Sequence, residues 1–234
     1  MVSLRPSRPF AVRGLSAPLE LRESVRTRRL TLRLDPGRGL IQVVVPAGSD
    51  EADVIRFVNR HTGWIEARLA ALPPARPFLE GASIPVLGAP HTIRHDPGCR
   101  GAGQRSNGEI RVGGAPEHLP RRVRDLLVAE SRRVLSERAR VMADSLGTQV
   151  RGIAVRDTRS RWGSCSSKGR LSFSWRLILT PEPVLNYVVA HEVAHLHEMN
   201  HSSRFWTLVG RLVPDAAPSR AWLRSHGAEL LRLG

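Results

Sequence analysis

The sequence predicts an α+β protein, with a β-rich N-terminal part followed by a helix-rich C-terminal part that contains a small sheet. Residues 28–34, RRLTLRL, alternate apolar and polar side chains, which is typical of a half-buried strand. Apolar residues recur at helical spacing from about Pro120 to Leu146, which predicts a long helix. The stretch LSFSWRLIL at 171–179 predicts a strand that shortly precedes another helix.

The β-rich part begins with a predicted hairpin. The turn-forming sequence DPGRG at 35–39 separates the first strand from a second one, LIQVVVP. Ser49 or Asp50 can cap the start of a helix over 53–72, where apolar residues again follow helical spacing. The prolines of PPARP at 73–77 end that helix.

The middle of the chain predicts short strands. Residues 78–113 contain IPVLG, HTIRH and EIRVGG, with the polar loop DPGCRGAGQRSNG between the last two. Gly147 can end the long helix, since glycine adopts the left-handed conformation without strain. A strand near 151–156, a loop and the strand described above follow, and the next helix begins at about Pro183.

These elements define three expected regions. The N-terminus is Arg-rich, and we expect residues 1–21 to form a loose tail before the first strand. Residues 22–115 form the β-rich subdomain with one helical segment. Residues 116–234 form a second subdomain, which carries the functional motifs described below.

The composition limits the class of protein. No run approaches the roughly 18 apolar residues that a membrane span needs, and the N-terminus lacks the apolar region of a secretory signal. The two cysteines, Cys99 and Cys165, do not make a disulfide framework, so we expect a reducing, cytoplasmic location.

The net charge of +15 favours a nucleic-acid partner at first sight. However, Lys168 is the only lysine, and the arginines are dispersed along the chain. That pattern is more typical of arginine used wherever a cation is tolerated, with solvated charged faces, than of a dedicated polyanion surface.

The sequence HEVAHLHEMNH at 191–201 predicts a metal site. His191 and His195 lie about 40° apart on one helix face, so both imidazoles can reach one ion. A catalytic zinc site keeps three protein ligands and an open position for water. Glu192, beside the first ligand, can hold that water and take its proton as general base.

The third ligand requires the chain to leave the helix. Met199-Asn200 offers an exit after which His201 can return toward the metal. The same separation occurs in the metzincin pattern HExxHxxGxxH, but Glu198 replaces its glycine and no Met-turn follows. Asp215 and Glu229 remain alternative third ligands. Zinc is the expected cofactor, one per chain, with manganese, cobalt and nickel left open.

A second motif, RSRWGSC at 159–165, precedes the strand and the HExxH helix. The order RWGSC, RLIL, YVVAHEVAHL and NHSSRFW resembles the YgjP-like metallopeptidase domain family, whose members carry a WGSC motif and are related to SprT-like zincins. Further matching segments in the N-terminal part extend the resemblance over about residues 22–212. It implies a minimal zincin-like metallopeptidase domain, with an HExxH active-site helix and a small sheet.

The resemblance supports His191, His195 and His201 as zinc ligands and Glu192 as the base. It also implies substrate-binding residues beside the cleft, where a strand edge can pair with an extended peptide. The candidates are Arg161, Trp162, Gly163 and Ser164. From helical spacing, Tyr187 lies on the face of His191 and can donate to a developing oxyanion, although core packing is the commoner role. Cys165 is a conceivable extra ligand, with structural packing favoured.

These observations predict a zinc-dependent hydrolase, first of all a metallopeptidase that acts on peptides or proteins. One alternative is a nucleotide phosphoanhydride hydrolase, since arginines near the cleft would bind phosphates. Another is a DNA-associated protease or binding protein that uses the basic surface. A comparison of peptide hydrolysis with nucleotide hydrolysis distinguishes the peptidase from the phosphoanhydride hydrolase. DNA binding that weakens steeply with salt would support the DNA-associated protein.

Overall fold

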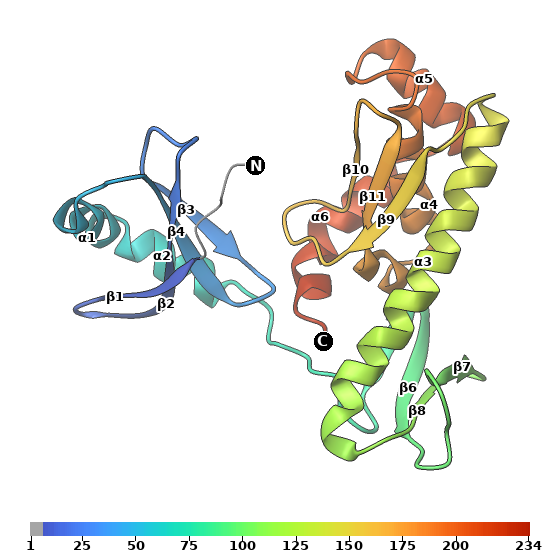
Figure 1. The fold of residues 1–234 in the computed structure, drawn as a ribbon, viewed down its shortest axis with the longest axis horizontal. Helices are drawn as coiled ribbons and strands as arrows, with labels where there is room; N and C mark the ends of the chain where they lie inside the picture. Colours follow the sequence, from blue (N-terminus) through green and yellow to red (C-terminus); the bar gives the residue numbers. More distant parts are fainter. Residues whose placement is uncertain (1–6) are drawn as a thin grey trace. The chain divides into compact units, whose positions relative to one another are not determined.

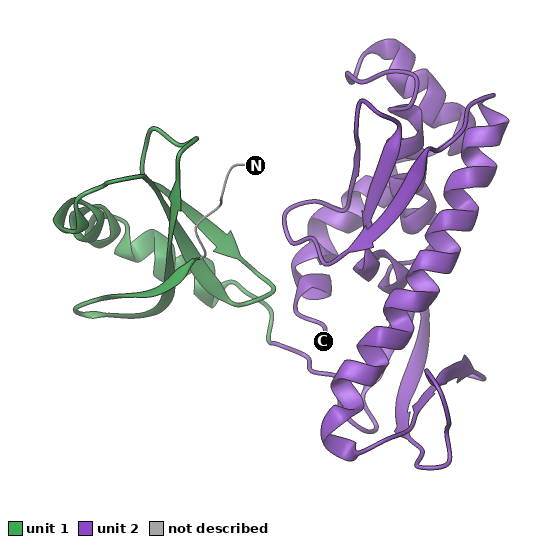
Figure 2. Ribbon diagram, viewed as in Figure 1, with its two compact units in different colours: residues 1–74 green, residues 75–234 purple. Residues whose placement is uncertain are grey.

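The computed structural model describes residues 7–234. Contacts within the chain divide it into two compact units, residues 1–74 and residues 75–234 (Figure 2). This division differs from the boundary predicted near residue 115. The short strands between 83 and 112 belong to the second unit because their side chains share one core with the long helix that follows; they include Ile84, Val86, Ile93, Ile110 and Val112.

Unit 1 consists of a four-stranded sheet and two helices (Figure 1). These elements are β1 (Arg8–Val12), β2 (Leu15–Ser24), β3 (Thr31–Asp35), β4 (Leu40–Pro46), α1 (Glu51–Arg60) and α2 (Thr62–Ala70). The strand order is β1-β2-β4-β3. The antiparallel pair β3–β4 confirms the predicted hairpin, with Leu34 opposite Ile41, while β2 lies parallel to β4.

The structure differs from the loose tail predicted over 1–21. Residues 1–6 lie outside the described part of the chain, but β1 and most of β2 fall within that range. Phe10, Val12, Leu19 and Leu21 are buried in the core of unit 1. Burial of these apolar side chains stabilises the two strands, whereas the surrounding arginines and prolines hide the pattern in the sequence.

The predicted helix over 53–72 is interrupted. Asp50 caps α1 as expected, with its side chain accepting a hydrogen bond from Ala52 N at 3.0 Å. The break falls at His61, whose φ of −114° and ψ of 13° leave the helical region. The His61 ring also bonds to Phe57 O at 2.7 Å, so a local side-chain contact accompanies the break.

Unit 2 begins with a second four-stranded sheet, of order β5-β6-β8-β7, packed against the long helix α3. These elements are β5 (Ser83–Val86), β6 (Ala89–His95), β7 (Gln104–Ser106), β8 (Glu109–Val112), the 3-10 turn η1 (Pro116–His118) and α3 (Leu119–Ser145). The predicted strands and helix are confirmed within a few residues. Strand β7 is an addition, because it lies in the segment predicted as a polar loop.

The rest of unit 2 combines a three-stranded sheet with three helices (Figure 1). They are β9 (Gly152–Arg156), β10 (Gly163–Cys165), β11 (Arg170–Ser174), the 3-10 helix η2 (Trp175–Leu179), α4 (Glu182–Ala194), α5 (Ser203–Leu212) and α6 (Ala217–Leu231). The order is β10-β11-β9, with β10 antiparallel and β9 parallel to β11.

The strand predicted over 171–179 ends at Ser174. All five residues of η2 are buried, which a strand with alternating faces on this small sheet would not achieve. Helix α6 is an addition to the helices that the sequence predicts. None of the helices in residues 7–234 is both long enough and apolar enough to span a membrane.

Candidate metal centre

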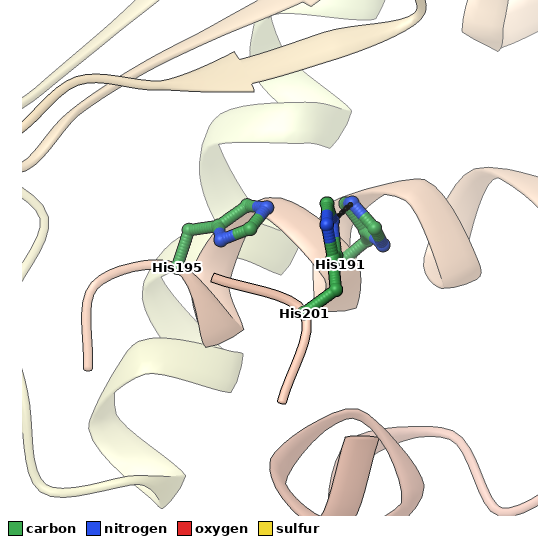
Figure 3. Close-up of side chains that lie close together, drawn as sticks. All are labelled: His191, His195 and His201. Carbon is green, nitrogen blue, oxygen red and sulfur yellow. Dashed lines mark hydrogen bonds between the residues drawn. The ribbon is translucent and has the colours of Figure 1, made fainter. Parts of the chain in front are cut away.

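Three histidines converge where helix α4 ends (Figure 3). His191 lies in the last turn of α4, His195 is its C-cap, and His201 lies in the segment before α5. One ring nitrogen of each lies within 4.8 Å of the others, and the Nε2 atoms of His191 and His201 are 3.2 Å apart. The chain leaves the helix at His195, earlier than the predicted exit at Met199-Asn200, and this brings His201 back to the helix end.

The separation of the His191 and His201 nitrogens fits a zinc ion. Zinc binds imidazole nitrogen at about 2.0–2.1 Å in tetrahedral geometry, which places two ligand nitrogens about 3.3 Å apart. The distance of 3.2 Å between His191 and His201 agrees with this value. Among the described residues, these three histidines are the group that could hold an ion, and neither Asp215 nor Glu229 joins it.

Backbone contacts orient the imidazoles. His195 Nδ1 lies 2.9 Å from the carbonyl oxygen of Glu198, so its proton is donated there and Nε2 stays free as a ligand atom. Asn200 Oδ1 accepts a hydrogen bond from Ser202 N at 3.0 Å, which shapes the turn before α5. His191 Nδ1 is buried without a hydrogen-bond partner.

Aromatic rings support the triad from α5. Phe205 is fully buried, and its ring centroid lies 4.5, 4.7 and 4.9 Å from those of His195, His201 and His191. Trp206 stacks on His201 at 6.0 Å. Trp206 also contacts Arg220, whose guanidinium lies 5.1 Å from the centre of the Trp206 ring. One helix thus packs against all three imidazoles.

Burial also sets the protonation of the site. It lowers the pKa of His191 to about 4, with smaller effects from the positive charges of His195, His201 and Arg220. The imidazole of His191 is therefore neutral at physiological pH, which is the form that binds a metal.

Glu192 is buried, with 6% of its surface exposed. Burial raises the pKa of Glu192 to about 7, and the positive charge of Arg161 opposes this increase. A carboxyl group that titrates near neutrality can both accept and release a proton. A Cβ atom built on Gly163 would lie 2.6 Å from Glu192 Oε1 and 2.5 Å from its Cγ, so the Glu192 side chain packs directly on the glycine.

A pocket of about 310 Å³ adjoins the triad. It is lined by Arg161, Trp162, Gly163, Tyr187, Val188, His191, Glu192 and Leu223. The structure therefore brings four of the five predicted substrate-binding residues together with the predicted base. Ser164 is the exception: it alternates with Gly163 along β10 and lines a different groove.

Sequence reasoning missed the contribution of α6. Leu223 completes the pocket wall, and Arg220 contacts Trp206 beside the triad. Gly227 approaches Trp162, since a Cβ there would lie 3.3 Å from the indole ring. No signal in the sequence links this helix to the histidines, because the connection is made only by tertiary packing.

Two rival ligands have other roles. Asp215 Oδ1 accepts a hydrogen bond from Ala217 N at 3.2 Å, at the start of α6. Cys165 packs against the core, and burial, followed by the negative charge of Glu192, raises the pKa of its thiol to about 11. Cys165 does not belong to the group of three histidines, which favours the packing role.

Residues 28–226 match the family model described as YgjP-like, metallopeptidase domain. Curated proteins show no match. Among solved structures, the crystal structure of the metallopeptidase zymogen of Pyrococcus abyssi abylysin is similar at 23% identity and a TM-score of 0.35, over 40% of this chain and 92% of that chain. This second likeness is too weak to bear on fold or function.

Proposed function

Because the chain belongs to the family of YgjP-like metallopeptidase domains, we propose that it is a zinc-dependent peptidase with Glu192 as general base. The observation that carries this proposal is the convergence of His191, His195 and His201 beside a buried glutamate that faces the same pocket. The three histidines would hold the metal. When bound, zinc polarises a substrate carbonyl and lowers the pKa of water toward about 7.

The residues of the pocket have separate roles in this proposal. Glu192 accepts a proton from the attacking water and donates it to the leaving amine. Tyr187, whose pKa is raised by burial, keeps its phenol proton and can donate to the substrate oxygen. Trp162 and Leu223 offer apolar surface for a substrate side chain.

The edge of the three-stranded sheet supports a peptide as substrate. Strand β10 is one of the two edge strands, so its outer backbone groups are not used by the sheet. An extended peptide can add to such an edge through main-chain hydrogen bonds. Gly163 in β10 packs on Glu192, which would hold the added peptide next to the base.

Two substitutions test this proposal. In the Glu192→Gln protein, elemental analysis should find zinc retained, while mass spectrometry of a mixed peptide substrate should find cleavage lost by about 100-fold or more. His201→Ala should lose zinc and cleavage together. Peptide cleavage that persists in zinc-loaded Glu192→Gln protein would remove Glu192 from the role of base. Nucleoside triphosphate hydrolysis measured in parallel distinguishes the phosphoanhydride alternative.

A further inference from the structure

The three-stranded sheet has an outer face that differs in character from its buried face. The inner side chains of β9 and β11 join the core; they are Ile153, Val155, Leu171 and Phe173. On the outer face, the register aligns Ser164 with Ser172 and Ser172 with Ala154. These small side chains floor a groove of about 600 Å³.

Arg156, Arg161 and Arg170 line this groove, which we call the basic groove. All three are exposed, and their guanidinium groups make no ion pair or hydrogen bond with another described residue. No acidic residue lines the groove. Arg105, by contrast, is neutralised by Glu130 at 2.8 Å. Within the basic groove, these positive charges therefore have no acidic side chain beside them.

We propose that the basic groove binds acidic side chains of the peptide substrate, an inference that rests on the peptidase function proposed above. Arg161 links the two regions, because it lines both the basic groove and the pocket that contains Glu192. Arginine forms planar, bidentate hydrogen bonds with carboxylates, so unpaired guanidinium groups around a floor of small side chains match that ligand.

The geometry of β10 explains how one peptide reaches both regions. Side chains alternate between the two faces of a strand. Gly163 faces Glu192, whereas Ser164 faces the basic groove. A peptide that adds to β10 alternates in the same way, so residues next to those on the pocket side extend over the arginines.

The lining of the basic groove favours a peptide over a nucleic acid. Binding of single-stranded nucleic acid depends on aromatic side chains on which the bases stack. No aromatic residue lines the basic groove. Its position against the edge strand β10 also matches the path of an extended peptide.

The test compares two fluorescent peptides of the same sequence, except that one contains glutamate where the other contains glutamine. Fluorescence anisotropy with zinc-loaded Glu192→Gln protein measures binding without cleavage. At low salt we expect the glutamate peptide to bind about tenfold more tightly, since charge-assisted hydrogen bonds exceed neutral ones. The Arg156→Gln/Arg170→Gln substitutions should abolish this preference.

A matched control removes the same charge elsewhere. Arg132 and Arg140 are exposed on α3, and the Arg132→Gln/Arg140→Gln protein should keep the preference in full. Equal binding of both peptides, or equal loss in both double variants, would overturn the proposal. A single-stranded DNA oligonucleotide that binds more tightly than the glutamate peptide, through Arg156 and Arg170, would overturn it as well.

Cleavage by the zinc-loaded wild type separates this inference from the proposed function. If both peptides are cleaved with equal kcat/KM and bind equally, the peptidase function stands and the inference is overturned. If the glutamate peptide binds through the basic groove but neither peptide is cleaved, the acidic-ligand site is supported and the peptidase function fails.

Discussion

Gly163 leaves free the space that the Glu192 side chain occupies. An added methyl group would lie within 2.6 Å of the carboxylate oxygen and 2.8 Å of its carbon, closer than van der Waals contact allows. We predict that Gly163→Ala displaces Glu192 and lowers kcat by about 100-fold, while zinc content is unchanged. Steady-state kinetics and elemental analysis on the same sample measure both quantities.

Gly210→Ala is the matched control. Gly210 lies in α5, and a methyl group there would meet no atom within 4 Å. Since alanine is favoured over glycine in a helix by about 0.5–1 kcal/mol, this substitution should preserve activity and slightly raise stability. Wild-type kcat in the Gly163→Ala protein would show that Glu192 is not positioned by this contact.

Cys165 is expected to be unreactive despite its partial exposure. Burial and the nearby Glu192 raise the pKa of its thiol to about 11, and the thiolate is the nucleophilic form. In metal-free protein, alkylation of Cys165 by iodoacetamide at about pH 8 should be much slower than in denatured protein, where a cysteine has a pKa of about 8.5. The rate should rise about tenfold per pH unit up to about pH 11. Peptide mass spectrometry measures it, and a rate independent of folding would contradict the shift in pKa.

The spacing of residues in the sequence predicts the candidate metal ligands and the base. It does not predict which residues from other elements pack against them. The positions of His191, His195 and Glu192 need only helix geometry, so the sequence indicates them directly. The roles of Gly163 and Arg220 depend on contacts between elements far apart in the chain. The spacing of residues within a motif cannot predict such contacts.

At the scale of elements, Phe205 connects α5 to the triad. Its fully buried ring lies within 5 Å of all three imidazole centroids. We predict that Phe205→Ala costs about 3–5 kcal/mol of unfolding free energy in metal-free protein and also weakens zinc binding. Urea unfolding measures the first effect, and competition with a chelator of known affinity measures the second.

Phe78→Ala provides the comparison for this prediction. Phe78 is equally buried in the core of unit 2, but it packs against Trp175 rather than the histidines. It should lower stability by a similar amount without changing the zinc affinity of the folded protein. Equal zinc affinity in the two variants would show that Phe205 contributes packing alone.

The elements that the sequence predicted less well share one cause. Periodicity identified α3 and the β3–β4 hairpin because one face of each is buried and the other is not. The segment η2 is buried on all sides, so no periodicity distinguishes it from a strand. Periodicity likewise cannot predict a helix end that depends on a single residue, such as the end of α1 at His61.

At the scale of the whole molecule, the division between units could not be predicted from composition. The strands from 83 to 112 follow those of unit 1 in the chain, and a grouping by element type places them with unit 1. In the structure they belong to unit 2, because their apolar faces pack in the same hydrophobic core as α3. The order of the sequence motifs predicts more than composition does, since it indicates the family whose model matches most of the chain.

This division leads to a prediction about independent folding. All three candidate ligands, Glu192 and the whole supporting core lie in residues 75–234. A fragment with these residues buries a continuous core of its own, so it should fold cooperatively and bind one zinc per chain. Bound zinc stabilises the folded state by mass action, and a free concentration of 100 times Kd corresponds to about 2.7 kcal/mol. Thermal unfolding monitored by circular dichroism should therefore show a higher Tm with zinc than with chelator, and the His201→Ala fragment should lose most of that increase. A fragment that is unfolded with and without zinc would mean that unit 2 requires residues 1–74.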